Sequence, residues 1–218
     1  MNDQTDLPSL QDLVRTEPVQ KRSSERIELL LDAAADLIDV GGIDSLTTSE
    51  VATRSGSSVG VVYRYFPNIQ SLLRGLAARN MERYTDMVFA SLATEKTEWR
   101  SALDSAIDAY ISLNRTLPGF RALRFGDVID SRFIDTELSN NAVMARAFAG
   151  ILGEKYDFEP TDALVFDLEV IVEIVDALMK RAFLSDRDGD ERFLDRAREI
   201  ARDYLRDHAN LPNVTQDA

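Results

Sequence analysis

The sequence predicts an all-α protein of about nine helices, in which a small helix-turn-helix domain precedes a larger helical domain. Apolar residues recur at intervals of three and four along most of the 218-residue chain, which is the spacing of one helix face. No segment alternates apolar and polar residues as a half-buried strand does. Glycine and proline fall between the periodic segments, where they begin or end helices.

The first helix is expected from about Ser24 to Val40. Ser23 or Ser24 is suited to cap its first turn, because a serine hydroxyl accepts a hydrogen bond from a free backbone amide there. Gly41-Gly42 follows the last apolar position and is expected to end the helix. The apolar face of this helix consists of Ile27, Leu30, Leu31, Ala34 and Ile38.

The second helix is expected to be short, from Thr47 to about Ser55. Thr47 and Glu50 have the spacing of a capping box, in which the threonine hydroxyl accepts from the amide three residues on and the glutamate reaches back to the threonine amide. Gly56 then permits a tight turn.

A third helix, Val59 to Tyr65, is expected after a serine cap at Ser57 or Ser58. It should end at Phe66-Pro67, because the residue before a proline disfavours the α conformation. Two short helices joined by a glycine turn form a helix-turn-helix, whose second helix lies in the DNA major groove. The segment 58–66 is therefore the predicted recognition helix.

Longer helical patterns fill the rest of the chain, at about 68–92, 98–116, 118–128, 136–155, 161–184 and 191–208. The expected organisation is a flexible N-terminal arm at 1–21, a DNA-binding domain at 22–67, a helical ligand-binding and dimerisation domain at 68–210 and a disordered tail at 211–218.

The charge distribution is uneven. The net charge of −13 argues against nucleic acid as a partner, because phosphate contacts need Lys and Arg. From Val51 to Met81, however, there is no Asp or Glu, and the window holds Arg54, Arg64, Arg74 and Arg79. A locally basic module on an acidic body is typical of a DNA reader with a separate sensor domain. A chance gap in acidic residues remains the alternative on charge alone.

Several classes of function are disfavoured by composition. The chain has no cysteine and one histidine, His208, expected on the surface of the last helix, so we expect neither a metal nor a cofactor. No nucleophile–base pair or phosphate-binding glycine loop indicates an enzyme. No apolar run reaches the ~20 residues that span a bilayer, and the polar N-terminus does not resemble a signal peptide. We therefore expect a cytoplasmic protein with no membrane partner.

The predicted recognition helix carries groups suited to DNA. Hydroxyls at its start and on its tyrosines can hold phosphates, an arginine can hold phosphate or guanine, and valines can touch thymine methyls. A helical glycine costs ~1 kcal/mol relative to alanine, which makes sense if the backbone must approach another surface. The alternative is a plain α-hairpin, with Tyr63 and Phe66 in the core and Gly60 as a packing notch. The candidate DNA contacts are Thr47, Ser58, Val59, Gly60, Val61, Tyr63, Arg64 and Tyr65.

The segments 46–52, 55–66 and 72–73 resemble the DNA-binding domain of the TetR family. That family opens its second helix with a threonine and carries a Gly-x-Ser-x-Gly-x-x-Tyr-x-Tyr-Phe recognition segment, matched here from Gly56 to Phe66. The resemblance implies that Thr47, Ser58, Tyr63 and Tyr65 contact the DNA backbone. It also implies that the groove-facing set is Val59, Gly60, Val61 and Arg64.

One position departs from the family pattern. The fourth helix of the family usually opens with Lys-Glu, and that lysine meets a phosphate, whereas this chain has Ile69-Gln70. One backbone anchor is therefore missing, and operator affinity is expected to be weaker or less salt-dependent. The hypothetical substitutes are Arg74, Arg54 and Lys21-Arg22.

The resemblance also implies that the last two long helices form a dimeric four-helix bundle. The segment 161–184 is compatible, because it is apolar around most of its circumference and needs cover on more than one side; the core of a monomer is the alternative. The expected dimer residues are Leu168, Ile171, Val172, Val175, Leu178, Phe193, Ile200 and Tyr204. The expected pocket residues, each of which could instead be plain core, are Phe89, Tyr110, Asn114, Phe125, Met144, Phe148, Phe166 and Glu169.

The predicted function is a ligand-responsive transcriptional regulator of the repressor type. As a homodimer it would bind a palindromic operator in double-stranded DNA, and a small, largely apolar effector would release it. The alternative is a helical interaction or sensor protein of the same fold with weak or lost DNA binding.

Overall fold

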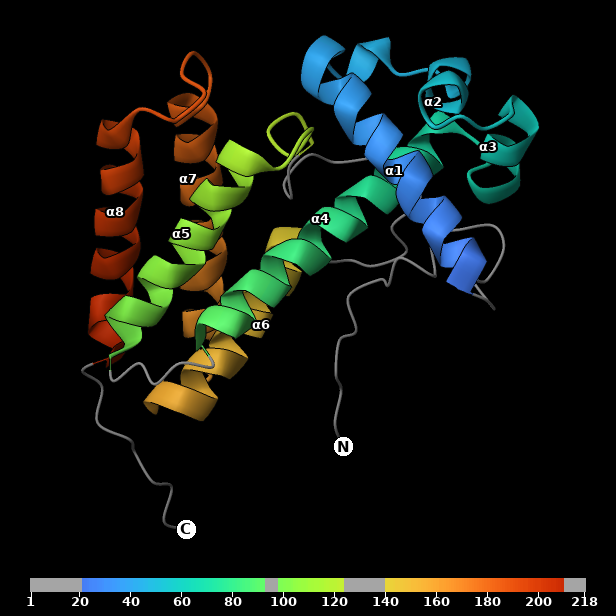
Figure 1. Ribbon diagram of the computed structural model, residues 1–218. Coiled ribbons are helices and arrows are strands. Elements are labelled where there is room, and N and C mark those ends of the chain that lie inside the picture. The colour runs from blue at the N-terminus through green and yellow to red at the C-terminus, as the bar shows by residue number, and fades with distance from the viewer. Residues whose placement is uncertain (1–20, 93–97, 124–139, 210–218) are drawn as a thin grey trace. The chain divides into compact units, whose positions relative to one another are not determined.

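The computed structural model describes residues 21–92, 98–123 and 140–209, and all secondary structure within these ranges is helical. This confirms the predicted fold class. The helices are α1 (Lys21–Gly41), the 3-10 turn η2 (Ile43–Ser45), α2 (Thr48–Arg54), α3 (Val59–Tyr65), α4 (Ile69–Leu92), α5 (Trp99–Thr116), α6 (Asn140–Tyr156), α7 (Asp162–Ala182) and α8 (Glu191–Ala209) (Figure 1).

The chain divides into two compact units. The first comprises residues 1–85 and 116–135, and the second residues 86–115 and 136–218, so the division falls within α4. Among the described helices, none has the length and apolarity to cross a membrane. The described side chains also contain no cluster of metal-binding type.

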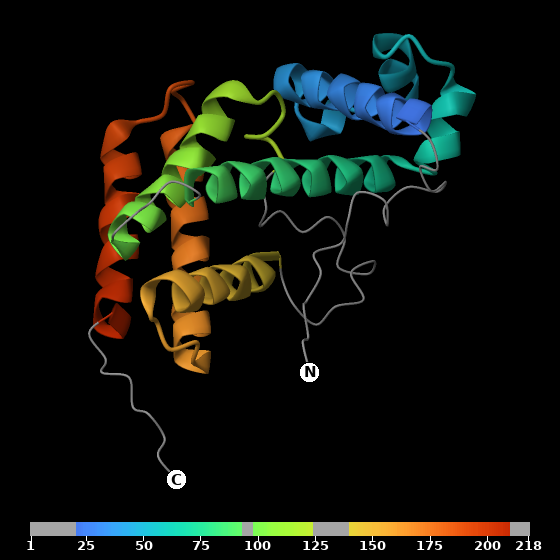
Figure 2. The ribbon, with the colours of Figure 1, turned by 60° about the horizontal axis from the view of Figure 1, so that its bottom comes forward.

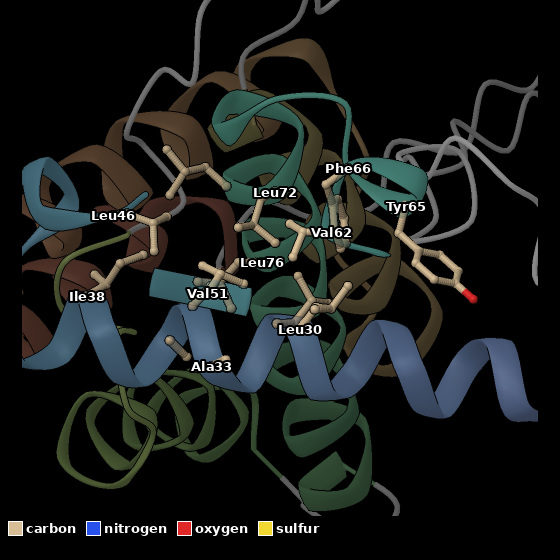
Figure 3. Packing of buried hydrophobic residues seen from close by; sticks show 14 of the residues in the cluster. Leu30, Ala33, Ile38, Leu46, Val51, Val62, Tyr65, Phe66, Leu72 and Leu76 are labelled. Atoms are coloured by element: carbon tan, nitrogen blue, oxygen red, sulfur yellow. The ribbon is translucent and has the colours of Figure 1, made fainter. Parts of the chain in front are cut away.

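The first unit is built around α1 and the beginning of α4. The buried faces of these helices meet the inner sides of α2 and α3 in one apolar cluster (Figure 3). Phe66, which caps the C-terminus of α3, is fully buried, and a Cβ built at Gly75 would lie only 2.9 Å from its ring. The glycine therefore makes room for the aromatic ring. The fully buried aliphatic side chains around it include Leu30, Leu31, Leu72 and Leu76.

The ends of α1 differ in part from the prediction. The helix begins at Lys21, three residues earlier than expected, and the Ser23 hydroxyl lies 3.3 Å from the hydroxyl of Tyr65. Its C-terminal end is as predicted: Gly42 has a φ of 74° and donates to the Ile38 carbonyl at 2.9 Å.

The expected helix at 118–128 is wrong over its described part, because residues 118–122 form turns. Gly119 has a φ of 72°, a left-handed conformation that L side chains rarely adopt. A Cβ at this position would lie 2.8 Å from the carbonyl oxygen of Ala35, and the Gly119 amide donates to Asp39. Tertiary contacts with α1 thus hold this segment as a turn. Residues 124–139 lie outside the described part of the chain, which includes the expected start of the next helix at 136.

In the second unit, α7 packs against both α6 and α8. Thr161 caps α7 by accepting from the Leu164 amide, as its place before an apolar run suggests. Ion pairs join α8 to α5: Arg198 pairs with Asp108, and Arg202 pairs with Asp104. The hydrogen bond that the Arg202 guanidinium donates to Asp104 raises the pKa of Arg202.

Candidate nucleic-acid interface

The turn between α2 and α3 is set by local hydrogen bonds. Gly56 has a φ of 63°, and the Ser57 amide donates to the Ala52 carbonyl at 2.9 Å. Ser58 then caps α3 in an extended conformation and accepts from the Val61 amide. These contacts all lie within a few residues, which explains why the sequence predicted the motif correctly.

The N-terminus of α2 is capped as predicted, with one difference. The Thr47 side chain accepts from the Glu50 amide at 3.2 Å. The Glu50 carboxylate accepts a hydrogen bond from the Thr47 hydroxyl at 2.8 Å, whereas the sequence predicted that it would accept from the Thr47 backbone amide. Thr47 is exposed at the start of α2, and its hydroxyl is held there by Glu50.

The helix α3 has a buried side and an exposed side. Val62, Tyr65 and Phe66 belong to the core of the first unit, as Figure 3 shows. Tyr63 is 46% exposed, and its hydroxyl lies 3.4 Å from that of Thr48, so α2 orients it. The predicted contacts that share this exposed side are Ser58, Val59, Gly60, Tyr63 and Arg64.

Two predicted contacts do not lie freely on that side. Val61 is half-buried against the core. The Tyr65 ring is buried, and its hydroxyl faces Ser23 of α1. Tyr63 and Tyr65 are two positions apart on α3, so they point to opposite sides of the helix, and the motif alone did not show which of the two faces out.

The environment of Gly60 favours an interface over an internal packing role. A Cβ built there would meet only the Ser58 hydroxyl, at 3.9 Å, among the surrounding atoms. The glycine therefore makes no room for a neighbour within the described chain. A backbone without a side chain at this exposed point allows another molecule to approach α3 closely.

Two of the four arginines in the basic window between Val51 and Met81 are paired with carboxylates of α1. Arg54 pairs with Asp36 at 3.0 Å, and Arg79, only 3% exposed, pairs with Glu28 and Asp32. Arg64 is exposed, and its guanidinium lies 5.9 Å from the centre of the Tyr65 ring. Of these arginines, Arg64 is the one placed on the exposed side of α3.

The predicted pocket residues differ widely in how far their side chains are buried. Phe89 is 54% exposed and Phe166 is 65% exposed, so neither is enclosed within the single chain. Phe125 lies outside the described residues. The hydroxyl of buried Tyr110 donates to Asp176 of α7. Tyr110, Asn114 and Met144 are buried, and Phe148 and Glu169 are half-buried.

The predicted dimer residues divide between two faces of α7 and α8. Leu168, Ile171 and Val175 are buried within the single chain, so they cannot offer accessible surface to a partner. Val172, Leu178, Phe193 and Ile200 are half-buried, and Tyr204 is exposed.

The all-helical fold and the exposed, capped α3 define a helix-turn-helix protein. Comparison with family models extends this: residues 30–76 match the model described as bacterial regulatory proteins, tetR family, and residues 97–209 match the tetracyclin repressor-like C-terminal domain. The chain belongs to the TetR family of transcriptional regulators.

Individual relatives agree with this assignment. A TetR-family regulator from Streptomyces coelicolor is 36% identical, with a TM-score of 0.72 over 84% of this chain and 99% of that one. The HTH-type transcriptional repressor KstR of Rhodococcus jostii is 41% identical over 59 residues, which are 27% of this chain and 28% of KstR. The regulator YvdT of Bacillus subtilis is 27% identical over 88 residues, 40% of this chain and 45% of YvdT. The matches to these two curated relatives thus span less than half of their lengths.

Proposed function

We propose that this regulator is a cytoplasmic repressor that binds a palindromic operator as a homodimer and is released by a small, largely apolar effector. The exposed side of α3 is the observation that carries the proposal, because Tyr63, Arg64 and a bare backbone at Gly60 lie together there. Two such helices about 34 Å apart would meet successive major grooves of one DNA face. The repressor mode is supported by the local similarity to KstR, an HTH-type transcriptional repressor.

The outward side of α7 supports the homodimer. Phe166, Val170 and Ala177 lie on the side opposite the buried Leu164 and Leu168, with the exposed Glu173 among them, and Phe166 is 65% exposed. A large apolar side chain exposed on a long helix is typical of a surface that another chain covers. We therefore place Phe166 on the dimer surface instead of the effector pocket, beside Phe193, Ile200 and Tyr204 of α8.

The effector site is proposed for the interior of the second unit. Tyr110 and Asn114 face inward from α5, and Met144 is buried on α6. Asp176 accepts the Tyr110 hydrogen bond, which places one polar contact among apolar side chains. A small ligand with a mostly apolar body fits such a composition.

The second candidate function is a helical interaction or sensor protein with weak or lost DNA binding. It is favoured by the net charge of −13 and by Ile69-Gln70, which replaces a basic residue at the start of α4. Catalysis is not proposed, because the exposed groups described above suit recognition of DNA.

The two candidates are separated by DNA selection and substitution. We expect the full-length protein to enrich a palindromic duplex from a random-sequence library. Arg64→Ala should weaken binding to that duplex by about 2–6 kcal/mol per dimer, because each arginine contributes ~1–3 kcal/mol of base recognition. Tyr63→Ala should weaken it as well, whereas Arg196→Ala on exposed α8 should not. Fluorescence anisotropy measures all four proteins, and unchanged binding by both α3 variants would refute the site.

The dimer is tested with two exposed phenylalanines. Phe166→Asp should convert the dimer to a monomer, because each protomer loses ~1.5–3 kcal/mol of apolar burial and a carboxylate takes the place of the ring. Phe89→Asp, a change of the same size on α4, is the matched control and should leave the dimer intact. Sedimentation velocity distinguishes the states. A wild-type monomer, or an unaffected Phe166→Asp dimer, would contradict the proposed surface.

A further inference from the structure

Four of the described arginines of the first unit pair with carboxylates of α1. Arg54 pairs with Asp36, Arg79 with Glu28 and Asp32, and Arg83 also approaches Glu28 at 3.7 Å. In the turn after α5, Arg121 pairs with Asp39. These side chains stabilise the unit internally and have little charge to offer an external phosphate.

Arg26 differs from this group. It is exposed, it pairs with no carboxylate among the described residues, and its Nη1 donates to the Ser57 hydroxyl at 3.3 Å. Ser57 comes directly before Ser58, the cap of the recognition helix. Within the described residues, Arg26 and Arg64 thus share two properties: both guanidinium groups are exposed, and both stand beside α3 without a neutralising carboxylate.

The beginning of α1 lies alongside α3. Arg26 reaches Ser57 just before α3, and Ser23 reaches Tyr65 at its last turn, so two contacts fix the neighbouring segments. The two views of the ribbon agree on this placement within the first unit (Figures 1 and 2). The charge of Arg26 is therefore held next to the Ser57 hydroxyl, one residue before the cap of α3.

We propose that Arg26 is an additional DNA-backbone contact, contributed by α1 and positioned by Ser57, which replaces the charge that position 69 lacks. The inference rests on the proposed DNA-binding function. Ile69 is half-buried against the apolar cluster, so it makes no such contact. An exposed guanidinium beside the Ser57 hydroxyl matches the chemistry by which proteins hold phosphate oxygens.

The other substitutes suggested by the sequence are less suited to this role. Arg54 is engaged by Asp36, and the Nη1 atom of Arg74 is buried. The side chains of Lys21 and Arg22 lie outside the part of the chain that the structure describes. Arg26 was missed from the sequence because its contact joins residues 31 positions apart.

Salt dependence tests the proposal. The probe is the duplex that the full-length wild-type protein enriches from a random library, with a random-sequence duplex beside it. Arg26→Ala should lower the slope of log affinity against log salt by about two per dimer, since each lost phosphate contact contributes ~0.9. Plotted as log affinity against log salt, the wild-type protein and Arg26→Ala should converge near 1 M salt. At 0.1 M salt their affinities should differ on the order of 10- to 100-fold. Both duplexes should be affected alike, because a backbone contact reads no sequence.

Three variants complete the design. Arg26→Lys should restore most of the slope, and Arg54→Ala, which removes an exposed but paired arginine, should leave the slope unchanged. Ser57→Ala should weaken binding with little change of slope, because the charge of Arg26 remains. An unchanged slope in Arg26→Ala overturns the proposal even if affinity falls. A wild-type protein that enriches no duplex overturns the proposed DNA-binding function and the role of Arg26 with it.

Discussion

Gly60→Glu is expected to abolish DNA binding while leaving the first unit folded. The new side chain would not clash with the rest of the protein, since only the Ser58 hydroxyl lies within 4 Å of the Cβ position. It would project from the exposed side of α3, where its volume and its negative charge both oppose a phosphate-lined groove. Replacement of a helical glycine also removes a penalty of up to about 1 kcal/mol, so stability should hold or rise.

Gly150 provides a matched control for this substitution. It lies within α6, and a Cβ built there also meets nothing within 4 Å. Gly150→Glu should therefore give a similar thermal stability with wild-type DNA affinity. Anisotropy titration of the selected duplex and thermal unfolding by circular dichroism measure the two effects. DNA binding by Gly60→Glu that stays within a few-fold of wild type would show that α3 does not enter the groove by this side.

Phe66→Ala is expected to destabilise the helix-turn-helix by ~3–5 kcal/mol, the usual cost of truncating a buried phenylalanine. Typical domains have only ~5–15 kcal/mol of stability, so this is a large fraction of the total. Two features make the cost high: the ring is fully buried, and Gly75 has no side chain that could move into the space. DNA binding should be lost with the fold, in contrast to Gly60→Glu.

Urea denaturation followed by circular dichroism measures this loss. Phe89→Ala is the control, because Phe89 is exposed and surface truncations usually change stability by ~0.5 kcal/mol or less. A loss below about 1 kcal/mol in Phe66→Ala would mean that the core repacks around the missing ring.

The sequence predicted best what short-range contacts determine. The caps at Thr47 and Ser58 and the turn at Gly56 each depend on partners no more than five residues away. Such contacts can be predicted from sequence, because the hydrogen-bond donor and its acceptor lie only a few residues apart. The all-α class and the recognition helix followed from them.

Long-range contacts account for what the sequence did not predict. The basic window suggested a DNA-facing charge, yet Arg54 and Arg79 are paired with α1. The turn at Gly119 depends on the backbone of Ala35, some 80 positions away in the chain. It also depends on Asp39, whose carboxylate accepts a hydrogen bond from the Gly119 amide. On α7, apolar residues occupy both sides of the helix, so periodicity alone could not tell Leu168, which faces inward, from Phe166, which faces out.

The single tryptophan of the chain is placed where it can serve as an optical reporter. Trp99, half-buried at the start of α5, meets the ring of Phe158 edge-on at 5.7 Å, and the Arg100 guanidinium lies 4.5 Å from the indole centre. Indole emission responds to nearby charge and to solvent access. A compound that rearranges α5 against the segment after α6 should therefore shift the intrinsic fluorescence of the unlabelled protein. Effector candidates can be screened in this way without DNA.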